Sequence, residues 1–152
     1  MNFVLDASVA LAWFLTRDDP EEAVLAQHAL QVTMIQGALV PHLWYPEVAN
    51  ALVLAERHGA SRPETSSGFL ADLDSLPVTP DLNLPHLMQK KILTVARNHQ
   101  LTAYDATYFE LGLRKGAPLA TFDRKLAEAY RKAGGQVFGD QPQFGPILTP
   151  KH

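Results

Sequence analysis

Short apolar runs alternate with longer amphipathic segments along most of this 152-residue chain. Each apolar run has three or four residues, which suits a buried strand of a parallel sheet, and the runs lie at 3–5, 38–41, 76–79, 118–121 and 136–138. The amphipathic segments predict helices at 8–15, 21–35, 46–58, 63–76, 84–99, 105–113 and 123–133. This alternation predicts an α/β fold in three α/β/α layers, with a central, mostly parallel sheet of four to five short strands.

Proline, glycine and capping residues mark the ends of these elements. Ser8 is placed to cap the first helix, and Pro77 and Pro80 make the third strand short or an edge strand. Residues 139–152 contain three prolines and two glycines. We therefore expect a single domain over residues 1–138, followed by a C-terminal tail over residues 139–152.

The composition is that of a folded protein, with 47% hydrophobic and 19% charged residues. The absence of cysteine excludes disulfides, iron–sulfur clusters, thiol nucleophiles and cysteine-based zinc sites. The net charge of −3 hides an asymmetry: residues 1–89 hold three Lys or Arg and eleven Asp or Glu, whereas residues 90–152 hold ten and five. A basic face for nucleic acid is therefore compatible with an acidic total.

No segment of the sequence predicts a membrane span or a secretory signal. The longest apolar stretch, 7–15, is interrupted by Ser8 and is shorter than the ~20 residues that a spanning helix needs. No basic region precedes it, and Asp6 interrupts the apolar start of the chain. We therefore expect a soluble cytoplasmic protein without a membrane partner.

Four acidic residues lie close to the ends of predicted strands. Asp6 follows the first strand, and Glu47 is in the first turn of the helix after the second strand. Asp123 follows the fourth strand, and Asp105 begins the helix that leads into that strand. The carboxyl ends of parallel strands line one crevice, so we expect these four carboxylates to converge there. Such a cluster repels itself unless a hard cation such as Mg²⁺ or Mn²⁺ is bound, and that ion can activate water for attack at phosphorus.

A purely structural interpretation of each acid stays open. Asp6, Asp105 and Asp123 are each placed to cap a helix. Glu47 is favourable beside any helix N-terminus, because the helix dipole attracts a negative charge there. The sequence leaves both interpretations in place for every one of the four residues.

Other polar residues near the acids also have two interpretations. The hydroxyls of Ser8 and Thr121 either support neighbouring acids or serve in capping and strand packing. Two basic pairs either contact a nucleic-acid backbone or form solvated helix faces: Arg114 with Lys115, and Arg124 with Lys125. The six histidines show no metal-ligand spacing, and the absence of a glycine-rich phosphate loop argues against a nucleotide cofactor.

Four segments of the sequence resemble the PIN-domain family, and specifically its VapC-type toxin ribonucleases. They are FVLDASVAL at 3–11, LWYPEVANAL at 43–52, LTAYDATYFEL at 101–111 and PLATFDRKL at 118–126. The Tyr-Asp-Ala-x-Tyr and Ala-Thr-x-Asp-x-x-Leu patterns together are a specific signal. Their order and spacing match across nearly the whole chain, leaving the tail unmatched.

The resemblance implies a PIN-like sandwich and an Mg²⁺- or Mn²⁺-dependent endoribonuclease. Carried over by position, the metal-binding and catalytic acids are Asp6, Glu47, Asp105 and Asp123, supported by the polar residues Ser8, Asn50 and Thr121. The resemblance also implies a homodimer, an RNA substrate and neutralisation by a small VapB-type antitoxin. In that setting the protein is the toxin of a type II toxin–antitoxin system.

Three other functions compete with this one. A PIN fold that only binds a partner, with its acids kept for structure, differs from the enzyme in a nuclease assay with and without metal. A phosphoacceptor receiver module needs adjacent acids after the first strand, where this chain has the single Asp6, and a lysine after the last strand. A haloacid-dehalogenase-like phosphatase needs an Asp-x-Asp sequence, and this chain reads Asp6-Ala7-Ser8.

Overall fold

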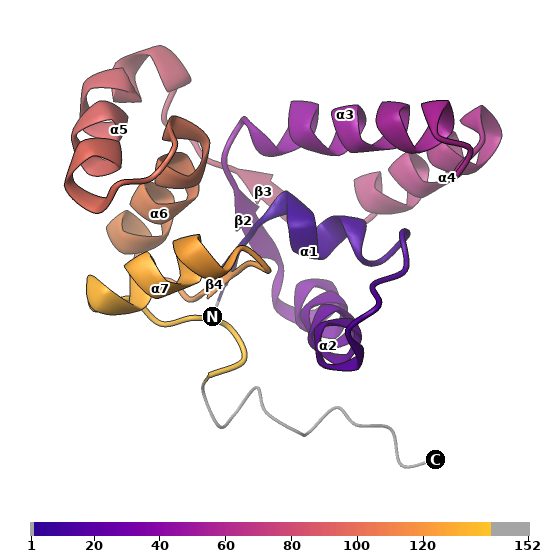
Figure 1. Cartoon of the computed structure of the whole chain (residues 1–152), viewed down its shortest axis with the longest axis horizontal. Coiled ribbons are helices and arrows are strands. Elements are labelled where there is room, and N and C mark those ends of the chain that lie inside the picture. The colour runs from indigo at the N-terminus through magenta and orange to yellow at the C-terminus, as the bar shows by residue number, and fades with distance from the viewer. Residues whose placement is uncertain (1, 141–152) are drawn as a thin grey trace.

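Helices and short strands alternate along the described part of the chain, residues 2–140, in a computed structural model (Figure 1). The strands are β1 (Phe3–Leu5), β2 (Ala38–Val40), β3 (Val78–Pro80) and β4 (Leu119–Ala120). The helices are α1 (Ala7–Leu11), α2 (Pro20–Gln36), α3 (Trp44–Arg57), α4 (Pro63–Asp74), α5 (Pro85–His99), α6 (Ala103–Lys115) and α7 (Arg124–Lys132). Residues 141–152, most of the predicted tail, lie outside the described residues. Within residues 2–140, no helix has the length and apolar character needed to cross a membrane.

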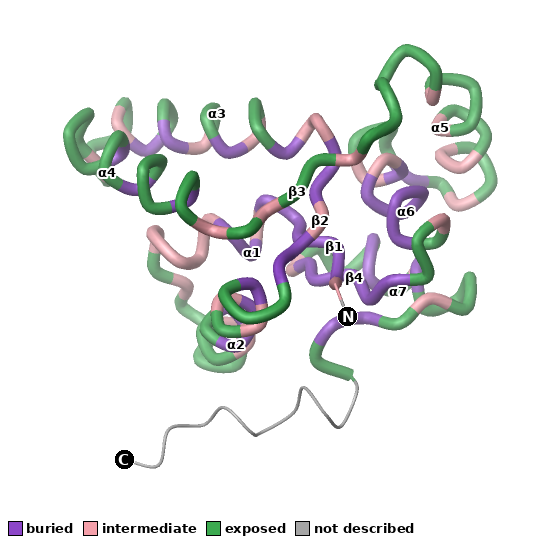
Figure 2. Tube along the Cα trace, turned by 180° about the vertical axis from the view of Figure 1, so that it is seen from behind, coloured by how far each residue is buried: buried purple, intermediate pink, exposed green. Residues whose placement is uncertain are grey.

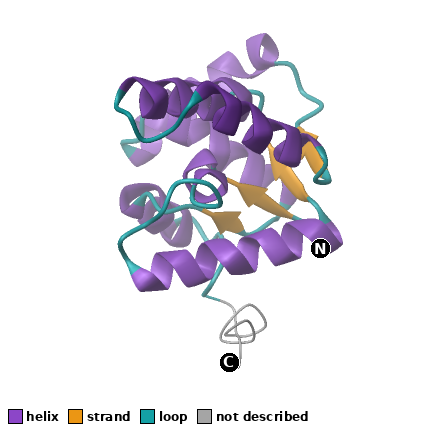
Figure 3. Cartoon of the chain, turned by 90° about the vertical axis from the view of Figure 1, so that its right-hand side faces the viewer, coloured by secondary structure: helices purple, strands orange, loops and turns teal. Residues whose placement is uncertain are grey.

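The four strands form one parallel sheet in the order β3-β2-β1-β4. Strand β1 lies inside it, with Val4 paired to Leu39 of β2 and to Leu119 of β4. Helices lie on both sides of the sheet (Figure 3), and the residues of β1 are buried (Figure 2). The predicted α/β fold with a central parallel sheet is confirmed. Strands covered on both faces need continuous apolar runs, which is why β1 reads Phe-Val-Leu without alternation.

The outer strands are as short as their sequences require. Strand β3 is at an edge, as Pro77 and Pro80 predicted, since a proline nitrogen cannot donate to a ladder. The predicted fifth strand at 136–138 is reduced to one parallel bridge between Val137 and Leu119. Its backbone still bonds Leu119, at 2.9 Å to the N–H and 2.8 Å to the carbonyl oxygen. This segment therefore covers the outer side of β4 without forming a full strand.

Three helices begin earlier than their sequence signals predicted. Helix α1 begins one residue before Ser8, which lies in the first turn instead of capping it. Helix α3 begins two residues before Pro46, because a proline is tolerated in a first turn whose N–H groups have no partner within the helix. Helix α6 is capped by Thr102, whose hydroxyl accepts from the Asp105 N–H at 3.1 Å. The interpretation of Asp105 as the cap of this helix is therefore wrong.

The contact between α6 and α7 is built around the buried Tyr130. Its hydroxyl donates to the Ala117 carbonyl oxygen at 2.7 Å, and its ring centroid lies 5.6 Å from that of Phe109. Gly112 and Gly135 lie directly against the phenol, so that a Cβ atom at either position would overlap it. The glycines therefore allow α7, which follows the end of β4, to pack closely on α6.

We predict that Gly112→Ala destabilises the fold, because its methyl group overlaps Tyr130 in a close-packed interior. Overpacking of this kind costs about 1–3 kcal/mol of unfolding free energy. The matched control is Gly68→Ala in α4, where a Cβ atom meets nothing within 4 Å and loss of a helical glycine stabilises by roughly 0.5–1 kcal/mol. Urea unfolding measures both changes, and an equal effect of the two substitutions would contradict the packing around Tyr130.

Candidate active site

The carboxyl ends of β1 and β4 form the edge at which the predicted acids lie. The chain crosses from one side of the sheet to the other between these two strands, and a crevice opens at such a position. Asp6 follows β1, and its N–H donates to the Ala120 carbonyl oxygen at the end of β4, at 3.0 Å. Thr121 and Asp123 come directly after β4. The fold therefore brings together residues that are 115 positions apart, as Asp6 and Thr121 are.

Two hydroxyls hold the carboxylate of Asp6. Ser8 Oγ donates to its Oδ2 at 2.7 Å, and Thr121 Oγ1 donates to the same oxygen at 2.6 Å. The hydroxyls also accept bonds themselves: Thr121 Oγ1 from the Asp123 N–H at 3.0 Å, and Ser8 Oγ from the Phe122 N–H at 3.2 Å. Asp6 makes no side-chain cap to α1. The capping interpretation of Asp6 and Ser8 is therefore wrong, and both belong to a network that joins the ends of β1 and β4.

Glu47 is held by a residue that sequence reasoning did not assign to the site. Tyr108 of α6 donates its hydroxyl to Glu47 Oε1 at 2.5 Å, and the Tyr108 hydroxyl oxygen accepts from the Ala7 N–H at 3.4 Å. Burial, the charge of Asp6 and the bond to Glu47 raise the pKa of Tyr108, so the phenol stays protonated and remains a donor. The Tyr-Asp-Ala-x-Tyr pattern at 104–108 contained this residue, but nothing in it pointed to a glutamate 61 positions away.

Burial and mutual repulsion raise the pKa values of three of the four acids. Burial raises the pKa of Asp6 against its two hydroxyl donors, and the charge of Asp123 adds to this effect. Burial also raises the pKa of Glu47 against the bond from Tyr108, with a contribution from the charge of Asp6. The pKa of Asp105 rises to about 6, first through burial and then through the charges of Asp123 and Asp6. A side-chain hydrogen bond with Asp123 and the charge of Glu47 add to it, so the four carboxylates share one electrostatic environment.

Two of the acids also suit the helices on which they lie. Asp123 caps α7, because its Oδ1 accepts from the Leu126 N–H at 3.0 Å. Glu47 is in the first turn of α3, where the helix dipole favours a negative charge. The structural interpretation is thus confirmed for Asp123 and compatible with Glu47, but these helix contacts do not explain why the charges of the four acids act on one another.

The donor set at this edge suits a hard divalent cation. The influences on the raised pKa values are burial, hydrogen bonds and the other carboxylates, and no basic side chain is among them. Carboxylate oxygens are the ligands that Mg²⁺ and Mn²⁺ prefer in proteins. Within residues 2–140, no three Asp, Glu or His side chains are already grouped closely enough to ligate one ion. The carboxylates would therefore have to rotate toward one another to hold it.

The remaining predicted site residues lie either near one of the four acids or at the far end of α6. Asn50 is exposed on α3, one turn beyond the acid of that helix. Arg124 and Lys125 form the first turn of α7, and Arg124 lines a cavity of about 480 Å³ that Thr121 and Asp123 also line. Arg114 and Lys115 lie in the last turn of α6, ~14 Å along the helix from its acid. Arg114 forms ion pairs with two carboxylates there, so of the two basic pairs only Arg124 and Lys125 directly follow one of the four acids in the chain.

Comparisons with known protein families and structures concern the fold as a whole. The chain matches the family model of the PIN domain over residues 3–132. It is 31% identical over 130 residues to "Ribonuclease VapC3" of Pyrobaculum aerophilum, an alignment that covers 86% of this chain and 95% of that protein. It is 36% identical over 89 residues to "Ribonuclease VapC1" of Mycobacterium tuberculosis, covering 59% of this chain and 65% of that protein. The crystal structure of PAE2754 from Pyrobaculum aerophilum superposes with a TM-score of 0.65 at 25% sequence identity, covering 85% of this chain and 86% of that one. The chain therefore belongs to the PIN-domain family and has VapC ribonucleases among its homologues.

Proposed function

We propose that this protein is a metal-dependent endoribonuclease that hydrolyses phosphodiester bonds of RNA at the four-carboxylate edge. The observation that carries the proposal is the placement of Asp105 with three other acids at one edge, where burial first, and then the charges of Asp123, Asp6 and Glu47, raise its pKa to about 6. A protein gains nothing for its stability from four carboxylates that repel each other in a partly buried crevice. A site built to hold a cation explains the arrangement, and the homology to VapC ribonucleases supports nuclease chemistry.

In this proposal the metal ligands are Asp6, Glu47, Asp105 and Asp123. A bound Mg²⁺ or Mn²⁺ would polarise the phosphate group and lower the pKa of a water molecule. Ser8 and Thr121 orient the Asp6 carboxylate through their hydroxyls. These hydroxyls are neutral donors, so they fix the direction of the carboxylate without cancelling its charge.

Three helices at this edge, α3, α6 and α7, supply further side chains that orient an acid or contact the RNA in this proposal. Tyr108 orients Glu47, because its hydroxyl donates to one carboxylate oxygen at 2.5 Å. Asn50 lies one turn after Glu47 on the same side of α3, within reach of a substrate at the crevice. Arg124 and Lys125 follow Asp123 directly, and their positive charges bind the phosphates that flank the bond to be cleaved.

We further propose that the protein is the toxin of a type II toxin–antitoxin system, acting as a homodimer and neutralised by a small VapB-type antitoxin. The names of its relatives support this proposal. Exposed apolar side chains also support a protein partner, since a contiguous apolar surface is typical of protein contacts. Exposed Leu93 and Tyr104 line a cavity of about 720 Å³ between α5 and α6, and Leu84 and Leu87 are exposed at the start of α5.

A PIN fold that binds without catalysis is the second candidate. The observation that favours it is the cap that Asp123 forms on α7, which gives this acid a structural reason to be present. In that case the other acids serve only to shape a binding surface. A nuclease assay separates the two candidates.

We predict that the purified protein, free of antitoxin, cleaves structured RNA with Mg²⁺ or Mn²⁺ and that EDTA stops the cleavage. Asp105→Asn is expected to lower the rate by about a hundred-fold or more, the range typical of groups that act on the reacting atoms. The matched control is Asp72→Asn, which removes an exposed carboxylate of α4 and is expected to leave the rate unchanged. Cleavage that persists in EDTA would contradict the metal mechanism, and an absence of cleavage with every metal would favour the binding fold.

We predict that Asp105→Asn raises the melting temperature of the metal-free protein at pH 7. The pKa of Asp105 lies near 6 in the folded protein and near 3.8 in an unfolded chain, so its ionisation destabilises the fold as the pH rises between these values. The difference in melting temperature between variant and wild type should therefore grow from pH 4 to pH 6 and then level off. Addition of Mn²⁺ should stabilise the wild type more than the variant, because the ion binds the folded state.

The control for this measurement is Glu64→Gln, which removes an exposed first-turn carboxylate of α4. It is expected to lower stability slightly, because the helix dipole favours a negative charge at that position. If Asp105→Asn behaves like Glu64→Gln in EDTA and Mn²⁺ shifts neither protein nor the wild type, the four acids do not form one site.

We predict that replacing Arg124 and Lys125 with alanine weakens RNA binding and flattens its dependence on salt. The slope of log affinity against log salt should fall by roughly one unit for each lost phosphate contact. The control replaces Arg57 and Arg62 with alanine. Both side chains are exposed, at the end of α3 and just before α4. Fluorescence anisotropy at several salt concentrations measures the slope, and equal slopes in both double variants would mean that Arg124 and Lys125 form an ordinary solvated surface.

A further inference from the structure

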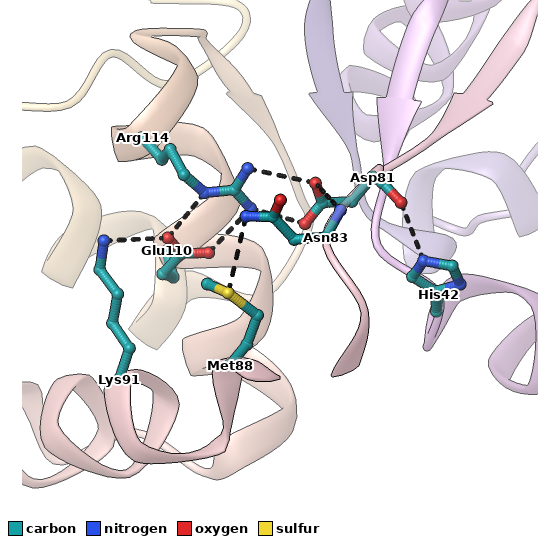
Figure 4. Close-up of polar contacts among 7 residues, drawn as sticks. All are labelled: His42, Asp81, Asn83, Met88, Lys91, Glu110 and Arg114. Atoms are coloured by element: carbon teal, nitrogen blue, oxygen red, sulfur yellow. Dashed lines mark hydrogen bonds and ion pairs between the residues drawn. The ribbon is translucent and has the colours of Figure 1, made fainter. Parts of the chain in front are cut away.

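Arg114 is at the centre of a polar network outside the acidic edge (Figure 4). Its guanidinium bonds both carboxylate oxygens of Asp81, at 3.1 and 2.5 Å. It also bonds both oxygens of Glu110, at 2.9 and 3.1 Å. Lys91 of α5 completes the network with a 3.3 Å ion pair to Glu110. Two positive and two negative charges are thus combined, and the side chains of Glu110 and Asp81 are only 3% and 9% exposed.

The two carboxylates of this network connect different parts of the fold. Glu110 precedes Arg114 by one turn of the same helix and otherwise contacts α5, so its bonds stay within the α5–α6 pair. Asp81 follows β3 and belongs to another part of the sheet. The Arg114–Asp81 pair is therefore the member of the network that attaches α6 to the sheet.

The backbone of Asp81 extends this attachment toward α3. Its N–H donates to the Val40 carbonyl oxygen at the end of β2, at 2.8 Å. Its carbonyl oxygen lies 2.8 Å from Nε2 of His42, in the turn that leads to Glu47 of α3. Figure 4 shows Asp81 between His42 on one side and Arg114 on the other. A single residue therefore joins the start of α3 to the end of α6.

These two elements carry two of the four acids at the acidic edge, and their charges interact. Glu47 lies five residues after His42, and Asp105 lies nine residues before Arg114 on a helix that acts as a rigid rod. We propose that the Arg114–Asp81 ion pair is a positioning device that sets the separation of Glu47 and Asp105, and so the fit of the site to a divalent cation. This inference rests on the proposed metal-dependent function.

The energetics of buried ion pairs agree with a positioning role. Removing charges from water offsets most of their attraction, so that a buried pair adds little net stability compared with apolar residues of the same size. A two-bond contact between guanidinium and carboxylate is nevertheless highly directional. Although burial alone raises the pKa of Asp81, the bonds from Arg114 and from the Asn83 N–H lower it, so this carboxylate remains charged and the contact keeps its direction.

The test compares Asp81→Asn with Glu110→Gln. Each substitution removes one buried carboxylate charge and leaves Arg114 the other, but only Asp81→Asn weakens the connection between α6 and the start of α3. We expect Asp81→Asn to weaken Mn²⁺ binding by about ten-fold, as is typical when a group that orients metal ligands is lost. Glu110→Gln should change it less than about two-fold. Titration calorimetry with Mn²⁺ alone measures the Mn²⁺ affinity of both variants, without RNA and without turnover.

Hydrogen–deuterium exchange of the metal-free proteins gives a second measurement. Asp81→Asn should speed the exchange of amides at 42–47 and 103–109, whereas Glu110→Gln should leave 42–47 unchanged. Arg114→Lys serves as a further variant should Asp81→Asn not fold, because lysine keeps the charge but cannot make two bonds to each carboxylate, and it should resemble Asp81→Asn.

The outcomes separate this inference from the proposed function. Equal effects of Asp81→Asn and Glu110→Gln on Mn²⁺ binding and on exchange would overturn the positioning role and leave a general contribution to stability. If the wild type binds no Mn²⁺ and cleaves no RNA, the proposed function fails. The exchange comparison then still decides whether the Arg114–Asp81 pair connects α6 to α3.

Discussion

The repulsion between carboxylates at the ends of β1 and β4 is the interaction around which the rest of this structure is arranged. Asp6 is buried, and the pKa of Asp105 is raised to about 6 by its burial and its acidic neighbours. A fold that keeps these groups together must be stable for other reasons. The buried apolar side chains of β1, β2 and β4 provide that stability, because their burial does not depend on the protonation of the acids.

The fold also limits how the acids are held. Asp6 and Glu47 receive hydrogen bonds from hydroxyl groups, those of Ser8, Thr121 and Tyr108. Hydroxyls fix an orientation while leaving the negative charge available, whereas an arginine at the same distance would neutralise it and occupy the place of a cation. Strong ionic contacts are instead found around Arg114, in the last turn of α6 and away from Asp105.

The sequence was sufficient to predict the parallel α/β fold, and the same local patterns indicate which acids follow the strands. Apolar runs mark strands, and the residue after a strand lies at a known edge of the sheet. The contacts between distant elements were not predictable in the same way. Thr102 and Asp105 are both reasonable caps for α6, and only the observed geometry shows that Thr102 is the one used.

Two residues show why such contacts escape sequence reasoning. Tyr108 is the last residue of the Tyr-Asp-Ala-x-Tyr pattern in the sequence, and its bond to Glu47 exists because α6 and α3 meet at the same edge. Arg114 was grouped with Lys115 as a basic pair, yet its partner Asp81 is 33 positions away in a segment with no distinctive pattern. A charged residue shows its type in the sequence, but whether it meets RNA, solvent or a buried carboxylate depends on the packing of helices.

The two contacts that fix α6 differ in charge according to their distance from the four acids. At its first turns the helix adjoins the acids, and there its tie to α3 is the neutral hydroxyl of Tyr108 on Glu47. At its last turn the acids are distant, and the tie to the sheet is the Arg114–Asp81 ion pair. Exchanging the two would place a permanent cation beside Glu47 and leave the buried carboxylate of Asp81 without an ionic partner. The choice of a hydroxyl at one end and a guanidinium at the other therefore follows from a single constraint, which is that the acidic edge keeps its charge while the helix beside it stays fixed.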